Sequence, residues 1–269
     1  WTWAQVTDRT RRFANLLVAH GLGRHGALAD RAGWESPHDH VALYATNGNA
    51  YLEAMVGAAK AGAAAVNVNY RYGPEELAYV LADASAAAVV YQRCFSDTLA
   101  AALDLLPHRP LLICVDDDTD HPLLEGALDY EAALAGASAE RPDVEWLPDD
   151  LYILYTGGTT GNPKGVLWRQ ADFLVAALGV RAPDGSEIAH LDQLVEAARG
   201  RHLAALPAPP FMHGAAHWNA LSCWIGGGTV VIQDHTDHFD PGDVLATCER
   251  HRVTSLLIVG DAFARPLAD

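Results

Sequence analysis

The sequence predicts an α/β protein in which mostly parallel β-sheets are covered by helices. Along most of the 269 residues, short apolar runs alternate with segments of helical periodicity, the pattern of parallel strands joined by helical crossovers. Half of the residues are apolar, enough for a sizeable buried core. Residues 116–148 are poor in apolar runs, so we expect two stacked subdomains, residues 1–134 and 151–269, joined by a linker at 135–150.

The elements of the first subdomain follow from periodicity and end signals. Residues 2–20 place apolar side chains on one helical face. The run Gly21-Leu-Gly-Arg-His-Gly26 formally matches a dinucleotide-binding fingerprint, but a helix rather than a strand precedes it, so we interpret it as a helix stop. Pro74 and two glutamates begin another helix, because proline suits the first turn and acids suit the positive end of the helix dipole. The other expected elements are strands at 41–45, 63–68, 86–91 and 111–115 and helices at 49–61 and 94–106.

The second subdomain continues the alternation after the linker. Residues 180–200 are more polar and are expected to form an insertion with one amphipathic helix. The other expected elements are strands at 151–155, 166–168, 203–206, 229–232 and 255–259 and helices at 171–178, 217–224 and 241–252.

The most informative stretch is Tyr155-Thr-Gly-Gly-Thr-Thr-Gly-Asn-Pro-Lys164-Gly165, which lies between two strand-like runs. Glycine lets the backbone approach a ligand closely, and threonine hydroxyls and a lysine add donors and charge, a combination typical of a concavity for phosphate oxygens. It is not a Walker A loop, because Lys164 follows a proline and no Ser or Thr follows it. The alternative is a flexible hairpin that binds nothing. The glycine count and the proline-fixed lysine favour a nucleotide-phosphate loop.

Composition and charge indicate which kinds of partner the protein binds and in which cellular compartment we expect it. The 34 acidic and 18 basic residues give a net charge of −16, which argues against non-specific binding to nucleic acid or anionic lipid and for a local anion site. The sequence shows no apolar run long enough to cross a membrane and no signal-like start. The four cysteines form no C-x-x-C pair, so we expect reduced thiols in a cytoplasmic protein. These cysteines are Cys94, Cys114, Cys223 and Cys248.

Three short clusters have the composition of metal ligands: His38-Asp-His40, Asp116-Asp-Asp118 and the segment 234–240. Each falls in a turn or at a strand end, where solvated side chains are the more frequent outcome. We therefore predict no protein-bound metal in any of them.

The loop and two further stretches resemble the adenylate-forming superfamily of acyl-CoA synthetases, luciferases and peptide-synthetase adenylation domains. Asn67-Val-Asn-Tyr-Arg-Tyr-Gly-Pro-Glu-Glu-Leu-Ala-Tyr-Val-Leu81 is similar to the segment that these proteins carry before the loop. Leu206-Pro-Ala-Pro-Pro-Phe-Met-His-Gly-Ala-Ala-His-Trp218 is similar to the motif before their acyl pocket. The amino-acid sequence of residues 164–170 and 212–214 is most similar to that of actinobacterial fatty-acid and steroid-side-chain CoA ligases.

The resemblance implies a two-step ligase reaction. A carboxylate attacks the α-phosphate of ATP to give an acyl-adenylate and pyrophosphate, and the thiol of coenzyme A then attacks the adenylate. It implies ATP, Mg²⁺ and coenzyme A as cofactors and a hydrophobic acid, fatty or steroid, as substrate. Many relatives have serine where this chain has Gly157, which leaves that contact to the backbone. The residues implied to bind the phosphates are Thr156, Gly157, Gly158, Thr159, Thr160, Gly161 and Lys164.

Lys164 and His213 are the candidate catalytic residues. The resemblance implies that His213 is a wall or gate between the nucleotide, acyl and CoA sites. A hydrogen-bonded structural histidine is the alternative, and the sequence shows no partner carboxylate that would make it a general base. The candidates for binding the acyl substrate are Met212, His213, His217, Trp218 and Gly260. For each of these, ordinary core packing is the alternative.

The resemblance also names features that these 269 residues do not show. They include the Tyr-Gly-x-Thr-Glu segment that contacts adenine and magnesium, the ribose-binding aspartate and the mobile C-terminal domain with its adenylation lysine. We therefore expect negligible ligase turnover from this stretch by itself.

Two other functions stay open at this point. One is an adenylation enzyme that passes the acyl group to a carrier-protein thiol or an amine, and the other is a non-catalytic module that binds nucleotide or acyl groups. A serine hydrolase is disfavoured because the sequence has no G-x-S-x-G. The expected partner is a small-molecule acyl substrate, with no nucleic acid and no integral membrane segment, and a homodimer is the assembly considered.

Overall fold

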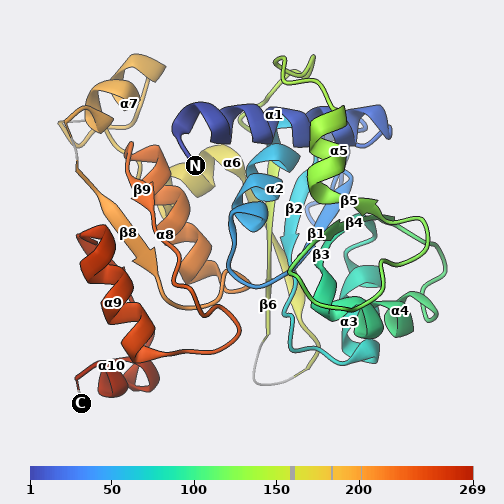
Figure 1. The fold of residues 1–269 in the computed structure, drawn as a ribbon. Helices are drawn as coiled ribbons and strands as arrows, with labels where there is room; N and C mark the ends of the chain where they lie inside the picture. The colour runs from blue at the N-terminus through green and yellow to red at the C-terminus, as the bar shows by residue number, and fades with distance from the viewer. Residues whose placement is uncertain (158–160, 183, 201, 269) are drawn as a thin grey trace. The chain divides into compact units, whose positions relative to one another are not determined.

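The structure is a computed structural model, and it describes residues 1–157, 161–182, 184–200 and 202–268. Contacts within it divide the chain into two compact units. The first unit comprises residues 1–45 and 49–170, and the second comprises residues 46–48 and the chain from residue 171 onward. The described strands form a seven-stranded sheet and a three-stranded sheet (Figure 1), which confirms the predicted α/β class.

The sheet of the first unit has the strand order β5-β4-β3-β1-β2-β6-β7. Each neighbouring pair is parallel except β6 and β7, which run antiparallel. The strands are β1 (His40–Tyr44), β2 (Ala64–Asn67), β3 (Ala86–Gln92), β4 (Leu111–Val115), β5 (Leu128–Asp129), β6 (Leu151–Thr156) and β7 (Lys164–Arg169).

The helices of the first unit cover both faces of this sheet. The chain moves from β1 to β2 in one direction and from β2 to β3 in the other, so right-handed crossovers place the intervening helices, α2 and α3, on opposite faces. In Figure 1, α1 and α5 lie beside α2, whereas α3 lies beside α4. The helices are α1 (Trp3–Ala19), α2 (Asn49–Lys60), α3 (Pro74–Asp83), α4 (Ser96–Leu103) and α5 (Tyr130–Gly136), with 3₁₀ turns at Leu28–Asp30 and Arg93–Phe95.

Local signals in the sequence account for the ends of these helices. Thr2 caps α1 with a capping box that it shares with Gln5. Gly21 takes a φ of 76°, the left-handed conformation that ends a helix, so the interpretation of this glycine as a helix stop is confirmed. Pro74 begins α3, and the side chain of Glu76 accepts a hydrogen bond from the amide of Gly73.

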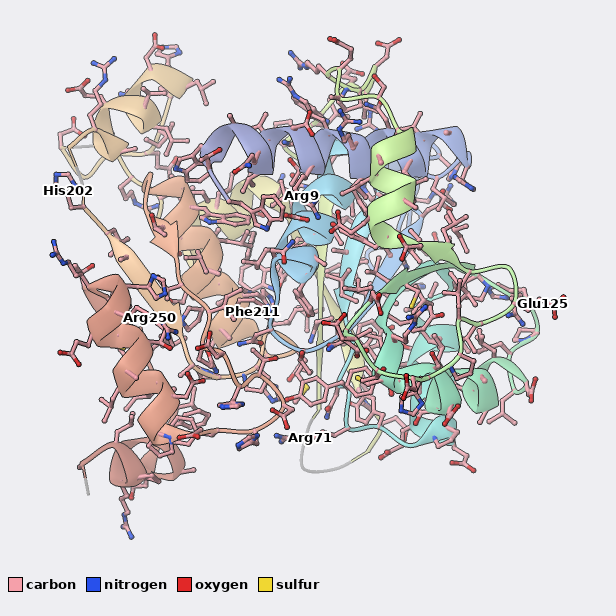
Figure 2. The ribbon with its side chains drawn as sticks, viewed as in Figure 1. Arg9, Arg71, Glu125, His202, Phe211 and Arg250 are labelled. Carbon is pink, nitrogen blue, oxygen red and sulfur yellow. The ribbon has the colours of Figure 1, made fainter. Side chains whose placement is uncertain are left out.

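A buried ion cluster joins α1, α2 and α5. The guanidinium of Arg9, labelled in Figure 2, donates to Glu53 at 2.8 Å and to Glu131 at 2.8 and 2.6 Å. The Tyr130 hydroxyl and the Asn49 amide also donate to Glu53, at 2.9 and 3.1 Å. The hydrogen bond from Arg9 is the main cause that lowers the pKa of Glu131. Glu53 is only 1% exposed, so these partners replace the hydrogen bonds that water would make to its carboxyl group.

The second unit is built on a three-stranded parallel sheet of order β10-β8-β9. Its strands are β8 (Ala204–Pro207), β9 (Thr229–Val230) and β10 (Ser255–Leu257). Its helices are α7 (Leu191–Ala198), α8 (Gly214–Ile225), α9 (Pro241–His251) and α10 (Asp261–Ala268), while α6 (Gln170–Asp172) continues as a π-helical turn over Phe173–Ala177. A buried cluster packs against both α9 and α10 residues; it consists of Leu206, Ala208, Val231 and Val244.

The subdomain boundary differs from the one predicted. We expected the second subdomain to begin at residue 151, whereas the contacts divide the chain after Gln170. The reason is that β6 and β7 extend the first sheet beyond β2, a pairing that depends on long-range contacts. The expected linker, residues 135–150, belongs to the first unit, and its first residues complete α5.

Two helices and a strand were missed by the sequence analysis. The strand β5 and helix α5 lie within residues 116–148, a stretch that is poor in apolar runs and for which no element was predicted. They are short, so they carry little periodicity, and α5 is held by the bond from Arg9 to Glu131. Helix α10 directly follows the acyl candidate Gly260, in a stretch for which no element was predicted.

Candidate functional site

The predicted phosphate loop connects β6 to β7 in the first unit. Strand β6 runs parallel to β2, so the loop leaves the carboxyl edge of the parallel strands, where open α/β sheets hold their ligands. The antiparallel ladder pairs Tyr155 with Gly165 and Thr156 with Lys164. The lysine therefore stands directly across from the first threonine of the loop, and both strands predicted around the loop are confirmed.

The described residues of the loop are open to solvent. Thr156, Gly157, Gly161 and Lys164 are all exposed. Gly161 has a φ of 108°, a conformation that residues with a Cβ rarely adopt, and a Cβ added to Gly157 would meet nothing within 4 Å. These positions leave amides, a hydroxyl and an ammonium accessible to an anion. Three further predicted residues, Gly158, Thr159 and Thr160, lie outside the described residues, and the phosphate contacts stay a prediction.

The side chain of Asn67 holds the strand just before the loop. Its amide donates to the carbonyl of Tyr155 at 2.9 Å, and its carbonyl accepts from the amide of Tyr155 at 2.7 Å. Asn67 is 5% exposed and ends β2. Asn67 begins one of the segments that resemble the family, but no role was predicted for it. A polar residue at the end of an otherwise apolar strand was the signal available.

Helix α3 reaches both ends of the loop. The Tyr79 hydroxyl donates to the carbonyl of Pro163 at 3.4 Å, and the Tyr155 hydroxyl donates to Asp83 at 2.6 Å. Burial and the bond to Asp83 raise the pKa of Tyr155, so the phenol keeps the proton that it donates. Neither Tyr79 nor Asp83 was singled out from the sequence.

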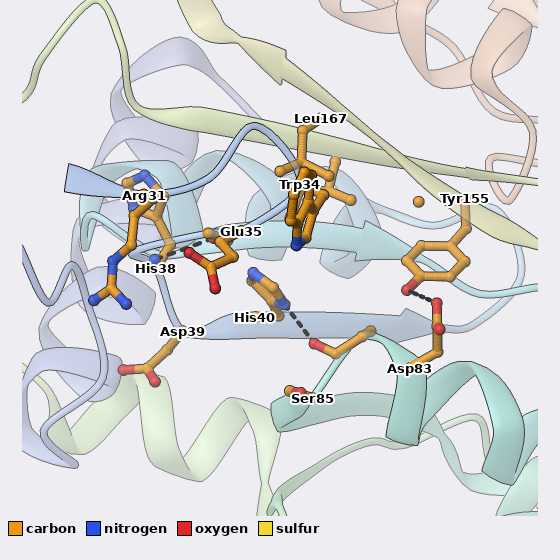
Figure 3. A pocket seen from close by; sticks show the side chains of 14 residues that line it. Arg31, Trp34, Glu35, His38, Asp39, His40, Asp83, Ser85, Tyr155 and Leu167 are labelled. Atoms are coloured by element: carbon orange, nitrogen blue, oxygen red, sulfur yellow. Dashed lines mark hydrogen bonds between the residues drawn. The ribbon is translucent and has the colours of Figure 1, made fainter. Parts of the chain in front are cut away.

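A cavity of about 520 Å³ lies beside this hairpin. Ile153, Tyr155, Gly165 and Leu167 of β6 and β7 form one wall, and Figure 3 shows the bond between Tyr155 and Asp83 at its edge. The other lining residues come from the start of β1, the end of α3 and the segment before β1; they are Arg31, Trp34, Glu35, Ser36, His38, Asp39, His40, Ala84 and Ser85.

The two histidines of the expected solvated cluster engage the backbone. His38 lies 2.7 Å from the carbonyl of Gly62 through Nδ1 and accepts from the amide of Leu151 at 3.2 Å through Nε2. His40 donates through Nδ1 to the carbonyl of Ala84. Burial lowers the pKa of both histidines, which favours neutral rings. Across the described parts of the chain, no three His, Cys, Asp or Glu side chains gather as metal ligands would.

The motif before the expected acyl pocket lies in the second unit. The side chain of Asn47 donates to the carbonyl of Pro209 at 3.0 Å and accepts from the amide of Phe211, labelled in Figure 2. These bonds hold the turn that leads from β8 to α8. His213 is the N-cap residue of α8 and is exposed, whereas Met212 is 2% exposed.

The remaining candidates for acyl binding differ in burial. His217 is fully buried, and its Nδ1 lies 2.7 Å from the carbonyl oxygen of Phe211. Burial lowers the pKa of His217 to about 4, so the ring is neutral at pH 7 and donates this hydrogen bond. Trp218 is half-buried against Phe173 with ring centroids 5.8 Å apart, and Gly260 is exposed. For His217 the geometry matches the structural alternative, and its contact with substrate stays a prediction.

Comparisons with known proteins agree with this fold and these motifs. The family described as AMP-binding enzyme matches residues 1–268. The chain is 45% identical to the medium-chain acyl-CoA ligase Mig of Mycobacterium avium, over 99% of this chain and 49% of that protein. It is 36% identical to the 3-oxocholest-4-en-26-oate–CoA ligase of Rhodococcus rhodochrous, over 100% of this chain and 46% of that protein.

The chain thus spans about half the length of the relatives that it matches. Its fold is similar to the inhibitor-bound N-terminal domain of FACL13 from Mycobacterium tuberculosis, with a TM-score of 0.74 at 24% identity, over 100% of this chain and 58% of that one. None of the helices in the described ranges is long and apolar enough to cross a membrane. The family match over nearly every residue, together with a glycine-rich loop at the carboxyl edge of the sheet, shows that this chain belongs to the AMP-binding enzymes.

Proposed function

We propose that the chain forms the phosphate-loop portion of an ATP-dependent acyl-CoA ligase. In that reaction ATP activates a hydrophobic carboxylic acid as its adenylate, and coenzyme A receives the acyl group. The observation that carries the proposal is the exposed loop between β6 and β7, with Lys164 paired across from Thr156. Membership of the AMP-binding enzymes supports it.

The groups of the loop suit phosphate oxygens. Lys164 offers a positive charge, Thr156 a hydroxyl donor, and Gly157 and Gly161 are exposed glycines whose backbone can approach an anion closely. Chemistry at phosphorus depends mainly on positioning and on neutralising oxygen charge. We therefore assign the β- and γ-phosphates of ATP to this loop, and Mg²⁺ would enter with ATP as its complex. Coenzyme A supplies the thiol, and His213 is proposed as a wall between its site and the acyl site.

A fatty acid is the proposed substrate class. The identity is 45% to a ligase named for medium-chain acids and 36% to one named for a steroid acid. We expect the protein made from the complete gene to have a kcat/KM for decanoate at least about tenfold above that for 3-oxocholest-4-en-26-oate, because a pocket shaped for a linear medium-chain acid has no room for the steroid rings. An enzyme-coupled assay of pyrophosphate release measures kcat/KM for each of the two acids. A steroid preference would contradict this assignment.

We also propose a location and an assembly for the protein. The net charge of −16 disfavours binding to anionic lipid, and ATP and coenzyme A are cytoplasmic metabolites, so we propose a cytoplasmic enzyme. A homodimer is proposed from the family resemblance.

Calorimetric titration of Mg·ATP into the protein made from the complete gene tests the phosphate site. We expect the wild type to bind and the double variant Lys164→Ala with Thr160→Ala to bind at least about tenfold more weakly, because hydrogen bonds to charged groups contribute roughly 1.5–3 kcal/mol. The control is Arg169→Ala, which removes one positive charge from the other end of β7, where Arg169 pairs with Asp149. Equal affinity in the wild type and the double variant would show that the loop does not hold the phosphates.

A further inference from the structure

Just before the loop, the side chain of Asn67 takes the place of a backbone partner for strand β6. The ladder between β2 and β6 pairs Val66 with Ile153, and two residues later the backbone of Tyr155 bonds to a side chain. Both its amide and its carbonyl are satisfied by Asn67, which lies 88 positions earlier in the chain. A strand whose backbone groups lose their partners is costly to keep in place. Asn67 therefore satisfies the backbone of β6 at Tyr155, one residue before the strand ends at Thr156.

The other end of the loop is tied to α3. Tyr79 and Asp83 lie one turn apart, so their side chains share a helix face. Tyr79 bonds to the carbonyl of Pro163, the residue before Lys164, and Asp83 bonds to the hydroxyl of Tyr155, the residue before Thr156. One helix face thus contacts the residues that enter and leave the loop.

Strands β6 and β7 also approach each other closely where Tyr155 lies across from Gly165. A Cβ placed on Gly165 would lie 2.8 Å from Cε2 of Tyr155 and 3.3 Å from Cγ2 of Ile153. The tyrosine ring therefore lies directly on the backbone of β7 at Gly165. This approach requires a glycine, and it locks Tyr155 next to the residue that follows Lys164.

We infer that Asn67 is a positioning residue for ATP, acting through a clamp made of Asn67, Tyr79, Asp83, Tyr155 and Gly165. The clamp holds Thr156 and Lys164 across from each other before nucleotide arrives. A glycine-rich loop would otherwise lose much conformational entropy on binding, and preorganisation reduces that cost. This inference rests on the proposed function, because it assigns the clamp to the ATP step of that reaction.

The test is the ATP dependence of pyrophosphate exchange in the protein made from the complete gene. Asn67→Ala removes both bonds, and Asn67→Asp keeps the shape and the acceptor but loses the donor. We expect the KM for ATP to rise about tenfold in Asn67→Ala and several-fold in Asn67→Asp, with the KM for the fatty acid changed by less than about twofold. If Asn67→Ala does not fold, the isosteric Asn67→Asp decides.

Asn15→Ala is the matched control. Its side chain likewise makes two hydrogen bonds to the backbone, in this case donating to the carbonyls of Ser138 at 2.8 Å and Glu140 at 2.9 Å from α1. We expect it to lower the thermal midpoint without changing the KM for ATP. A structural role of Asn67 would give the same pattern as Asn15, a lower midpoint with an unchanged KM for ATP, and that result would overturn the inference.

The outcome also separates the clamp from the function on which it rests. If the wild type shows no ATP-dependent exchange, the proposed function fails, and the clamp's role in ATP binding fails with it. If the wild type is active and Lys164→Ala weakens ATP binding while both Asn67 variants match the wild type, the clamp fails and the proposed function stands.

Discussion

Replacing Arg9 by leucine is expected to destabilise the protein by about 3–5 kcal/mol, because it leaves a buried carboxylate without its counter-ion. Glu53 is 1% exposed and accepts from Arg9 at 2.8 Å. The Arg9 side chain is itself 11% exposed and also bonds to Glu131, so its loss removes the ion pairs that join α1 to both α2 and α5. Urea denaturation of the variant and wild type measures the difference in the free energy of unfolding.

Two comparisons make the Arg9 prediction specific. Arg169→Leu breaks an ion pair with Asp149 in which both side chains are at least half exposed, and such surface pairs contribute roughly 0–1 kcal/mol. The double variant Arg9→Leu with Glu53→Leu removes both buried charges and is expected to recover much of the loss. If Arg9→Leu and Arg169→Leu lowered the free energy of unfolding equally, water would have to solvate the ion cluster around Glu53, and the prediction would be wrong.

Acidification from pH 6.5 to 4 is expected to destabilise the second unit by about 3 kcal/mol through His217. Burial lowers its pKa from 6.5 to about 4, and each unit of difference corresponds to about 1.36 kcal/mol. Between these values the unfolded chain binds a proton that the folded unit does not. Stability therefore rises with pH in this window and falls as the pH is lowered through it.

The comparison with His217→Asn isolates this contribution. Asparagine offers an amide donor near the carbonyl of Phe211, which His217 now contacts, but it does not titrate. We expect the variant to lose less stability than the wild type between pH 7 and pH 4.5, as measured by urea denaturation at each pH. His38 and His40 also have lowered pKa values, but they act equally in both proteins. Parallel pH profiles would contradict the prediction.

Local chemistry was sufficient to predict most elements and the candidate loop. Strand and helix alternation appears in short windows, because period-2 and period-3.6 patterns need only a few neighbouring residues. The loop stands out because three glycines, three threonines and a proline-fixed lysine occur within the nine positions after Tyr155. Its strands and its exposed ends were therefore accessible from the sequence.

The features that the sequence did not predict depend on contacts between residues far apart in the chain. Helix α5 is short and is stabilised by a bond from Arg9, which lies 122 positions earlier. The hairpin of β6 and β7 was assigned to the wrong side of the boundary because sheet membership is a long-range choice. The burial of His217 could not be predicted from its place in the motif, because one face of a helix can line a cleft while the next face packs in the core.

The sequence by itself determined the α/β class, the family segments and the residue types that a phosphate loop needs. The tertiary structure decided which sheet carries that loop, and it revealed that Asn67, Tyr79 and Asp83 hold its ends. The physical reason is the range of the interactions. Propensity and periodicity act between neighbours along the chain, whereas a side chain that braces a strand 88 positions away exists only once the strands have paired.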